Sequence, residues 1–493
     1  MQIDIKKILY IPVILLFFPA FAIWIPGLNK GFIINNIIFV IYTIFILLFD
    51  YKTLTYKFIQ IYNNTPFKYF CWTVIFMILN GILLSIFNFK LLLNVFSSIL
   101  MYIILWLLPI FIYFIYVIET HISYKNFMKL FIICFWINLI IGIISWLGEL
   151  FDITILTNIF NFFANNRILY DSNSQFDMGM QSSNFYAFGL PRLDNLFEEP
   201  AFYAKFLFLF LPIIYSFSNS KLKIVENTIF NLIIKKSFIF LMWLSIILTF
   251  SPIFLIFFVI STIIYYYKEI IKLIRKYWYI LIFVLLVFLI AISNFNWQNT
   301  YISRIINILS EVNSFEDLIL IEQSLASRLV NFINQIYVFF QNPFSGVGFS
   351  NLGYAIKEQL LHSPVTLTEE VDKKLMMSIM SNYKMAYNKA FVYEFLAENG
   401  IFIFSLFMYF YYKLFKSINI INKRFADYKN SFEMVISRGL KGVLINLFIM
   451  FFYAIFFTKC NEFYICLLLS IMFVFYYKKR RNFGKNINYN SNL

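Results

Sequence analysis

The sequence has very little charge for its length. Only 13% of its 493 residues are Asp, Glu, Lys or Arg, whereas 61% are hydrophobic and 22% are aromatic. These proportions lie far outside the range of soluble domains. The shortage of charge therefore excludes a soluble protein and indicates an integral membrane protein.

Cysteine and histidine are also scarce, with four and two copies. Cys71, Cys134 and Cys466 lie within apolar segments, and Cys460 lies at the edge of one. This distribution gives neither a disulfide framework nor the spacing of metal ligands. The chain also lacks a nucleotide-binding loop and a zinc motif. We therefore expect no metal site, no cofactor and no pump driven by nucleotide hydrolysis within this chain.

Long apolar runs are what the sequence has in abundance. About 20 apolar residues are enough to cross a hydrocarbon core of roughly 30 Å, and lipid offers no partner for an open backbone, so the runs predict helices. The expected fold is an all-α, polytopic membrane protein with about twelve transmembrane helices. The predicted spans lie at residues 8–26, 31–49, 69–87, 91–118, 128–150, 197–217, 237–250, 253–267, 277–293, 391–412, 441–457 and 462–477.

The spans divide the chain into five parts. Residues 1–150 hold helices 1–5 and residues 151–196 form a first extracytoplasmic loop. Helices 6–9 occupy 197–293, a second extracytoplasmic loop occupies 294–390, and helices 10–12 with a basic cytoplasmic tail occupy 391–493. Long loops beside a compact bundle are usually functional. We therefore look for chemistry in the two long loops.

Basic residues fall on alternate loops of this arrangement. With a cytoplasmic N-terminus, the inner segments carry 27 of the 40 basic residues but only 7 of the 25 acidic ones. The net charge of +15 is then explained by the positive-inside rule, and no nucleic-acid partner is expected. The pattern predicts a multi-pass protein of the bacterial cytoplasmic (inner) membrane with both termini cytoplasmic.

Two local features need an interpretation within this topology. A break at Ser251-Pro252 divides residues 237–267 into two short helices, because one long helix would reverse the side of every later loop. At the N-terminus, Lys6, Lys7 and an apolar run resemble a secretory signal. The run continues past the candidate cleavage site, so an uncleaved first span is the favoured alternative.

The second long loop contains one strongly patterned helix. In SRLVNFINQIYVFFQNP, apolar residues recur at helical spacing, and Arg328, Asn331, Asn334 and Gln335 lie on the opposite side. This pattern is typical of a helix lying in the outer interface with its apolar face toward the membrane.

The next residues, PFSGVGFSN, end this helix at Pro343. Gly346 and Gly348 suit a tight turn. Such a turn can expose backbone N–H groups to a phosphate; a turn without that function is the favoured alternative.

Four stretches between residues 185 and 410 together resemble one family. They are Arg192 followed by FEEPAFYAKFLF, then LTFSPIFLI, RLVNFINQIYVFFQNPFSGVGFSN and YNKAFVYEFLAENGIFIF. In this order they are similar to the O-antigen polymerase and ligase family. These multispan enzymes act on sugars linked to undecaprenyl pyrophosphate. Each stretch is short, and their order and common side of the membrane carry the resemblance.

Departures from the family pattern favour one branch of it. Ligases often carry a His-Asn pair before the re-entering helix, whereas this sequence has Tyr387 and Asn388 there, and His362 lies well upstream. The acid-Pro pair Glu199-Pro200 resembles polymerases more than ligases. A Wzy-type polymerase is therefore favoured, with a ligase as the nearer alternative and a lipid-linked oligosaccharide flippase as the alternative of another class.

The resemblance implies a metal-independent glycosyltransferase. A growing glycan would pass from undecaprenyl pyrophosphate to a sugar hydroxyl of an incoming lipid-linked repeat unit, at the outer membrane face. Membrane lipids and a polysaccharide chain-length regulator are the other implied partners. The product, a lipopolysaccharide side chain or a capsule, stays open.

This chemistry assigns roles to charged residues. Guanidinium groups bind phosphate oxygens in pairs, so Arg192 and Arg328 are the candidates that stabilise the leaving group, with Lys205 continuing the same wall. Tyr387 and Asn388 are candidate contacts of the sugar or acceptor. The candidates for the base that takes the acceptor's proton are Glu199, Glu198, Glu394, Glu398 and His362.

Each candidate also has a purely structural explanation. Glu198 and Glu199 precede a proline, as expected at a helix N-terminus. Lys205 faces either a wet cavity or the interface by snorkelling. Glu394 and Glu398 lie one turn apart, where like charges repel, so they need a positive partner or lie among headgroups.

Overall fold

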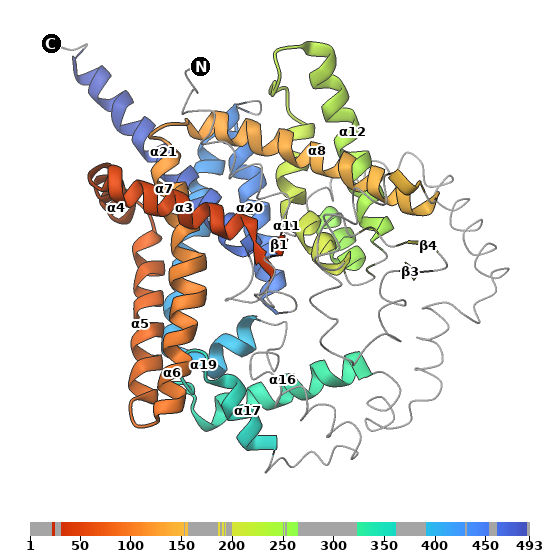
Figure 1. Ribbon diagram of the computed structural model, residues 1–493. Helices are drawn as coiled ribbons and strands as arrows, with labels where there is room; N and C mark the ends of the chain where they lie inside the picture. The colour runs from red at the N-terminus through yellow and green to blue at the C-terminus, as the bar shows by residue number, and fades with distance from the viewer. Residues whose placement is uncertain are drawn as a thin grey trace.

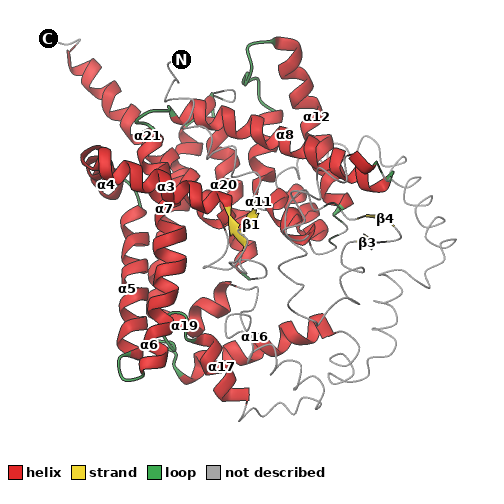
Figure 2. Ribbon diagram, viewed as in Figure 1, coloured by secondary structure: helices red, strands yellow, loops and turns green. Residues whose placement is uncertain are grey.

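The computed structural model describes residues 22–24, 31–151, 153–155, 186–187, 190–191, 193, 200–249, 251, 254–264, 323–360, 391–428, 431–452 and 461–490. Within these ranges the chain is mostly helical (Figure 2). Its only strands there form two short antiparallel pairs. These are β1 (Ala22–Trp24) with β2 (Gly31–Ile33), and β3 (Tyr186–Ala187) with β4 (Leu190–Pro191).

The N-terminal helices follow one another with short connections. They are α3 (Ile34–Phe49), α4 (Tyr51–Asn64), α5 (Phe67–Ser85), α6 (Phe89–Ser98), the π-helical η1 (Ile99–Leu107), α7 (Leu108–Val117) and α8 (Tyr124–Leu150). Because α6, η1 and α7 are continuous, they form one long rod beside α5 (Figure 1).

The remaining labelled helices come from four separated parts of the chain. They are α11 (Pro200–Ser218), α12 (Thr228–Leu248), α16 (Gln323–Gln341), α17 (Leu352–Leu360), α19 (Phe391–Arg424), α20 (Phe432–Phe451) and α21 (Asn461–Asn490). A shorter apolar helix, Phe254–Ile264, follows α12 after a break. That break agrees with the two-helix interpretation of residues 237–267.

Six of the described helices are long and apolar enough to cross a membrane, or seven if the bent pair α3 and α4 counts as one more. The protein is therefore a multi-pass helical membrane protein. The six are Phe67–Ser85, Phe89–Val117, Tyr124–Leu150, Thr228–Leu248, Phe391–Arg424 and Phe432–Phe451. Each coincides with a predicted span. The predicted span at 277–293 and most of that at 8–26 lie outside the described residues, and the end of the latter, Ala22–Trp24, forms strand β1 in place of the predicted helix.

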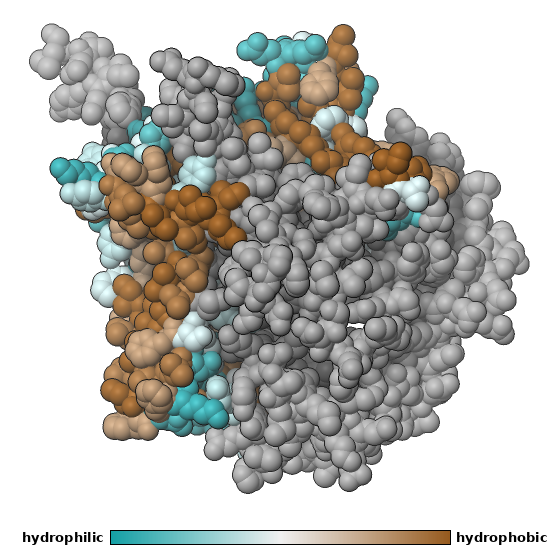
Figure 3. Space-filling view, viewed as in Figure 1, coloured by the Kyte–Doolittle hydropathy of each residue, from teal (hydrophilic) through white to brown (hydrophobic). Residues whose placement is uncertain are grey.

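Lipid-facing surface is visible on the outer side of these helices. Exposed large apolar residues follow α5 and the α6–η1 rod, among them Leu79, Leu83, Phe96 and Leu100. Figure 3 shows brown surface along this side of the molecule, with hydrophilic side chains above it and beside its lower part. A continuous apolar surface of this kind is suited to contact with lipid.

Two predicted helix starts are wrong by about two turns. Instead of starting at 237 and 441, the helices begin at Thr228 and Phe432. The physical reason is capping: the side chain of Asn227 accepts N–H groups of Ile229 and Phe230, which starts the helix before the apolar run. Ser431 caps α20 in the same way. Apolar length alone cannot detect these polar first turns.

Helix α4 is also absent from the sequence-based prediction, which placed only a connection there. The chain turns by 105° after α3, and Tyr116 of α7 donates a hydrogen bond of 2.8 Å to Asp50 at the bend. Because α4 contains Lys52, Lys57 and Gln60, it is too polar to span by itself and lies across the end of the bundle (Figure 1).

The core of the bundle forms where α11 packs against α20. A Cβ added to Gly439 of α20 would lie 2.9 Å from the Cα of Ile213, so the two backbones approach closely. Asn446 of α20 donates to the carbonyl of Phe208 at 2.7 Å and accepts from Ser261 at 2.9 Å. Small residues and buried amides are the usual means of joining helices in lipid.

The connections separate onto two ends of the bundle. The α5–α6 turn lies near residues 342–351 and α17 at one end, the lower end in Figure 1. At the opposite end, α4, the α7–α8 corner and the second half of α21 meet. The described part of the second predicted outer loop therefore lies beside the predicted outer α5–α6 turn, and three segments predicted to be inner meet at the other end.

Candidate functional site

The described part of the second long loop packs onto the beginning of α19. Helix α16 contacts both α17 and α19, and residues 342–351 connect α16 to α17. We call residues 342–351 the glycine turn. It fits between α19 and the outer surfaces of α5 and α6 (Figure 1).

Helix α19 is broken at Gly400, whose φ of 71° and ψ of 176° are not helical. A Cβ at this position would overlap the backbone carbonyl of Phe344. The break also frees the N–H of Ile401, which donates to the carbonyl of Pro343 at 2.9 Å. Only glycine tolerates both this φ and this contact. The break therefore admits the glycine turn.

The turn has the glycine conformation that the sequence predicts. Gly346 and Gly348 both have positive φ, at 66° and 92°. Five backbone N–H groups of the turn donate within the protein. They belong to Gly346, Val347, Gly348, Ser350 and Asn351, at N···O distances of 2.8, 3.0, 2.7, 3.1 and 3.1 Å. These five donors therefore bind protein groups.

Glu398 connects the turn to α19. Its side chain is buried, and one carboxylate oxygen accepts the N–H of Ser350 at 3.1 Å. The N–H of Leu352, in the first turn of α17, also donates to this carboxylate. A carboxylate at a helix N-terminus is favoured by the free N–H groups and the dipole. The described contacts of Glu398 are therefore those of a residue that positions the loop.

Glu394 lies one helical turn before Glu398 and is only 3% exposed. The two carboxyl groups interact electrostatically, and both act on the hydroxyl of Tyr102 in η1. The structure thus brings together two of the five predicted base candidates with a phenol from another helix. The π-helical segment next to them is relevant because such segments are frequent at functional sites.

Helix α16 carries Arg328 and is joined to α19 by ring packing. The rings of Phe332 and Tyr393 meet edge to face with centroids 4.5 Å apart. Tyr393 directly precedes Glu394 in the chain. The helix bearing one predicted arginine therefore packs against the turn bearing a predicted base.

Helix α16 buries two of its polar side chains. Asn334 and Gln335 are buried together with Val338, whereas Tyr337 and Phe340 are exposed. The two amides therefore lie on the side of the helix that packs against the protein. Sequence reasoning did not single out these two amides as site residues.

Several of these buried amide atoms have no hydrogen-bond partner among the described residues. They are Nδ2 of Asn334, both amide atoms of Gln335 and Oδ1 of Asn399. Buried polar groups are nearly always satisfied, and amides both donate and accept.

Polar residues of α5 and α6 hold the turn from the other side. Asn80 donates to the carbonyl of Ser345 at 2.7 Å, and Asn94 donates to the carbonyl of Ser350 at 2.6 Å. The hydroxyl groups of Ser98 and Ser350 are 2.5 Å apart. These residues were missed by the sequence analysis because single amides within an apolar run form no recognisable pattern.

The other predicted site residues are placed only in part. Lys205 is 5% exposed on α11, which favours the bundle interior over snorkelling at the lipid surface. Helix α11 begins at Pro200, as expected for a first-turn proline. The predictions outside the described residues are Arg192, Glu198, Glu199, His362, Tyr387 and Asn388.

The fold and this site define a class: a multi-pass helical membrane protein with buried carboxylates and amides gathered at one end of its bundle. No protein-family model matches the sequence, and no curated protein matches it.

Proposed function

We propose that the protein is a polysaccharide polymerase of the O-antigen type. It joins repeat units that are linked to undecaprenyl pyrophosphate, at the outer face of a bacterial cytoplasmic membrane. The proposal includes twelve spans, two large extracytoplasmic loops and cytoplasmic termini. One observation supports it most: Glu394 and Glu398 are buried one turn apart at the start of a broken helix, against α16 and the glycine turn.

The reaction needs two kinds of protein group. A hydroxyl of the acceptor sugar attacks the anomeric carbon of the donor glycan, the bond from that carbon to the pyrophosphate oxygen breaks, and the electron pair leaves with undecaprenyl pyrophosphate. A base must take the hydroxyl proton, and positive groups must stabilise the developing charge on the pyrophosphate. No step in this scheme requires a metal ion or a cofactor.

Of the two buried carboxylates, Glu394 is the better candidate base. The carboxylate of Glu398 accepts N–H groups from Ser350 and Leu352. Fewer of its lone pairs are therefore free to accept a proton from the acceptor sugar. In this proposal Glu398 positions the turn and Glu394 takes the proton. Arg328 on the adjacent helix and Arg192 are proposed to bind the pyrophosphate, with Lys205 extending the positive wall.

The buried amides give the proposal a sugar-binding surface. Asn334, Gln335 and Asn399 have amide atoms with unused hydrogen-bonding capacity in the described part of the chain. Sugar hydroxyls both donate and accept, so they match this lining. A phenol such as Tyr102 can supply a further contact to the acceptor.

Incubation of the purified protein with an undecaprenyl-pyrophosphate-linked repeat unit tests the proposal directly. A polymerase makes a ladder of longer lipid-linked glycans. A single transfer onto an added lipid A core identifies a ligase instead. Movement of the substrate across a vesicle membrane without a new glycosidic bond identifies a flippase.

The variant Glu394→Gln tests the assignment of the base. It keeps size and hydrogen bonding but cannot take a proton, so we expect polymerisation to fall about 10²-fold to 10⁴-fold. Glu226→Gln is a matched control, because Glu226 is exposed between α11 and α12, far along the chain from the site. Full activity in Glu394→Gln together with full activity in Arg328→Ala would remove this site from the mechanism.

A further inference from the structure

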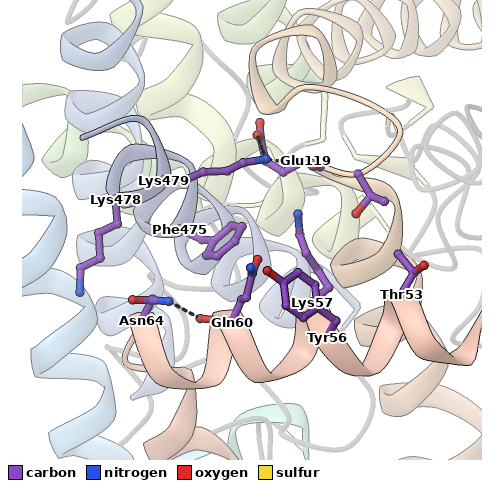
Figure 4. A pocket seen from close by; sticks show the side chains of 10 residues that line it. Thr53, Tyr56, Lys57, Gln60, Asn64, Glu119, Phe475, Lys478 and Lys479 are labelled. Carbon is purple, nitrogen blue, oxygen red and sulfur yellow. Dashed lines mark hydrogen bonds and ion pairs between the residues drawn. The ribbon is translucent and has the colours of Figure 1, made fainter. Parts of the chain in front are cut away.

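A second concentration of polar groups lies at the opposite end of the bundle. Helix α4, the α7–α8 corner and α21 enclose a hollow of about 560 Å³ (Figure 4). Its lining contains three lysines, Lys57, Lys478 and Lys479, but one acidic residue, Glu119. The proposed polymerisation reaction uses none of these four residues.

Glu119 already has partners at the α7–α8 corner and on α21. Glu119 has a φ of 65°, unusual for a residue with a side chain. One of its carboxylate oxygens accepts the N–H of Tyr124 at 2.7 Å, and the other lies 3.6 Å from Nζ of Lys479. The Lys479 ammonium also donates to the carbonyl of Glu119 at 3.4 Å. This pairing offsets one lysine, so Lys57 and Lys478 give the hollow an excess of positive charge.

Of these two lysines, Lys57 is buried and Lys478 is exposed. Lys57 is 5% exposed, and its ammonium lies over the ring of Phe475, 4.9 Å from the centroid. No ion pair involving Lys57 is found among the described residues. Burial lowers the pKa of Lys57 to about 8, and the charge of Lys479 acts in the same direction. A buried cation without a directly paired carboxylate is costly, and a bound anion would compensate for that cost.

The remaining lining on α4 is polar. Tyr56 and Gln60 contribute a hydroxyl and an amide group. Asn64 donates to the carbonyl of Gln60 at 2.8 Å, and the side chain of Thr53 hydrogen-bonds to Asp50. In Figure 4 the ammonium of Lys57 points up from α4 toward Glu119, and Lys478 closes the opposite edge beside Asn64. Ammonium groups combined with neutral donors are the combination that phosphate oxygens accept from.

The helix that supplies most of the lining also exposes apolar side chains. Phe58 and Ile59 of α4 are exposed large hydrophobic residues that lie on other faces of the helix than the lining residues Lys57 and Gln60. Helix α4 is therefore amphipathic, with its polar face toward the hollow. Basic pockets beside such a surface bind anionic lipid headgroups.

We propose that this hollow binds the phosphate of an anionic phospholipid headgroup, with Lys57 and Lys478 as its cationic ligands and the acyl chains along the apolar side of α4. The chemistry that is recognised is a phosphate oxyanion, which a free phosphate shares. The lipid is the favoured source because α4 combines this lysine-bearing face with exposed Phe58 and Ile59 on its other faces.

Lipid binding to the purified full-length protein tests the site. In phosphatidylcholine nanodiscs with a few per cent of labelled phosphatidylglycerol, we expect the wild-type protein to retain the label. The double variant Lys57→Gln/Lys478→Gln should bind it at least about tenfold more weakly. Lys478→Gln alone should weaken it by a smaller factor, and since Lys478 is exposed, that variant tests the site without disturbing a buried position.

The matched control removes two charges from the same helices. Lys52 on α4 and Arg481 on α21 are exposed and do not line the hollow, so Lys52→Gln/Arg481→Gln should bind the lipid like the wild type. Equal loss in the control and the test variant would overturn the proposal, since it would show a general effect of charge.

A second arm separates the two sources of phosphate. Inorganic phosphate is compared with chloride at equal ionic strength, and the melting temperature is measured in neutral detergent. Stabilisation by phosphatidylglycerol alone supports a lipid site. Stabilisation by inorganic phosphate alone overturns the lipid assignment and leaves an anion site for a soluble ligand. Absence of both effects overturns the proposal. None of these outcomes depends on polymerase activity.

Discussion

The two ends of the bundle hold their polar groups in different ways. At the end with the glycine turn, amide side chains and the carboxylate of Glu398 bind backbone groups, as when Asn94 donates to the carbonyl of Ser350. At the opposite end, charged side chains make the contacts, as in the pair of Lys479 with Glu119. Backbone contacts fix a unique geometry, whereas exposed ion pairs tolerate exchange and are screened by salt.

Two buried glutamates show the contrast most directly. Glu398 and Glu433 are both nearly buried. The carboxylate of Glu398 accepts backbone N–H groups from the turn and from the start of α17. The carboxylate of Glu433 instead binds Arg480, whose side chain is 67% exposed. The first arrangement fixes a loop in place, and the second joins two helices through a side chain that water also reaches.

The largest effect is expected from Gly400→Ala. The added Cβ would overlap the carbonyl of Phe344, and the positive φ of Gly400 disfavours any side chain. Strain at such a position costs of order 1–3 kcal/mol before the overlap is counted, so we expect at least about 3 kcal/mol of destabilisation. Thermal unfolding of the purified protein measures this.

Gly81→Ala is the matched comparison for that variant. Its Cβ would lie 3.0 Å from the Cβ of Phe349 and 3.2 Å from the backbone nitrogen of Phe349, which is a tight contact without overlap, and Gly81 has no positive φ. We expect a loss of about 1 kcal/mol, because a small shift of the neighbouring atoms relieves the contact. If Gly81→Ala were as damaging as Gly400→Ala, the positive φ and the overlap at Gly400 would not be the main cause of the lost stability.

A smaller difference should separate the two buried glutamates. Glu398→Ala leaves two N–H groups buried without an acceptor, which costs about 1–3 kcal/mol. Glu433→Ala frees an exposed arginine that water can solvate, so we expect about 1 kcal/mol or less. Limited proteolysis at the glycine turn and thermal unfolding both report the difference. The expected difference is contradicted if Glu433→Ala makes the glycine turn accessible to the protease, or if both variants lose the same free energy of unfolding.

The sequence predicts the spans well because their signal is local. An apolar run of sufficient length has one stable outcome in lipid, and so all six long apolar helices fall on predicted spans. The starts of α12 and α20 were placed late because the caps at Asn227 and Ser431 are single polar residues. Helix α4 was missed because its polar composition resembles a connection.

The candidate site is predictable only in part, for a different reason. Glu394 and Glu398 were identified because carboxylates at the end of an apolar run are conspicuous. The contacts of Asn80 and Asn94 join residues more than 250 positions apart, and no local pattern encodes such pairings. The inward orientation of Gln335 also depends on which helix α16 packs against, which one sequence does not reveal.

The smallest expected effect concerns the pH dependence of the hollow at the charged end. The pKa of Lys57 is about 8, chiefly because burial disfavours its ammonium form, with a further contribution from Lys479 and an opposing one from Glu119. Lys57 is therefore charged below pH 8 and loses its proton as the pH rises through that value. The phosphodiester of phosphatidylglycerol keeps its charge throughout.

Affinity for that lipid should therefore be full near pH 7 and decline toward pH 9. A lysine near an anionic headgroup contributes about 1 kcal/mol, so the decline should be about fivefold. Lys57→Arg keeps its charge at both pH values and should flatten the profile. Burial and the nearby Lys68 also lower the pKa of Lys478. Any pH dependence of lipid affinity that remains in Lys57→Arg therefore comes from Lys478. An unchanged slope in Lys57→Arg would mean that Lys57 does not face the phosphate.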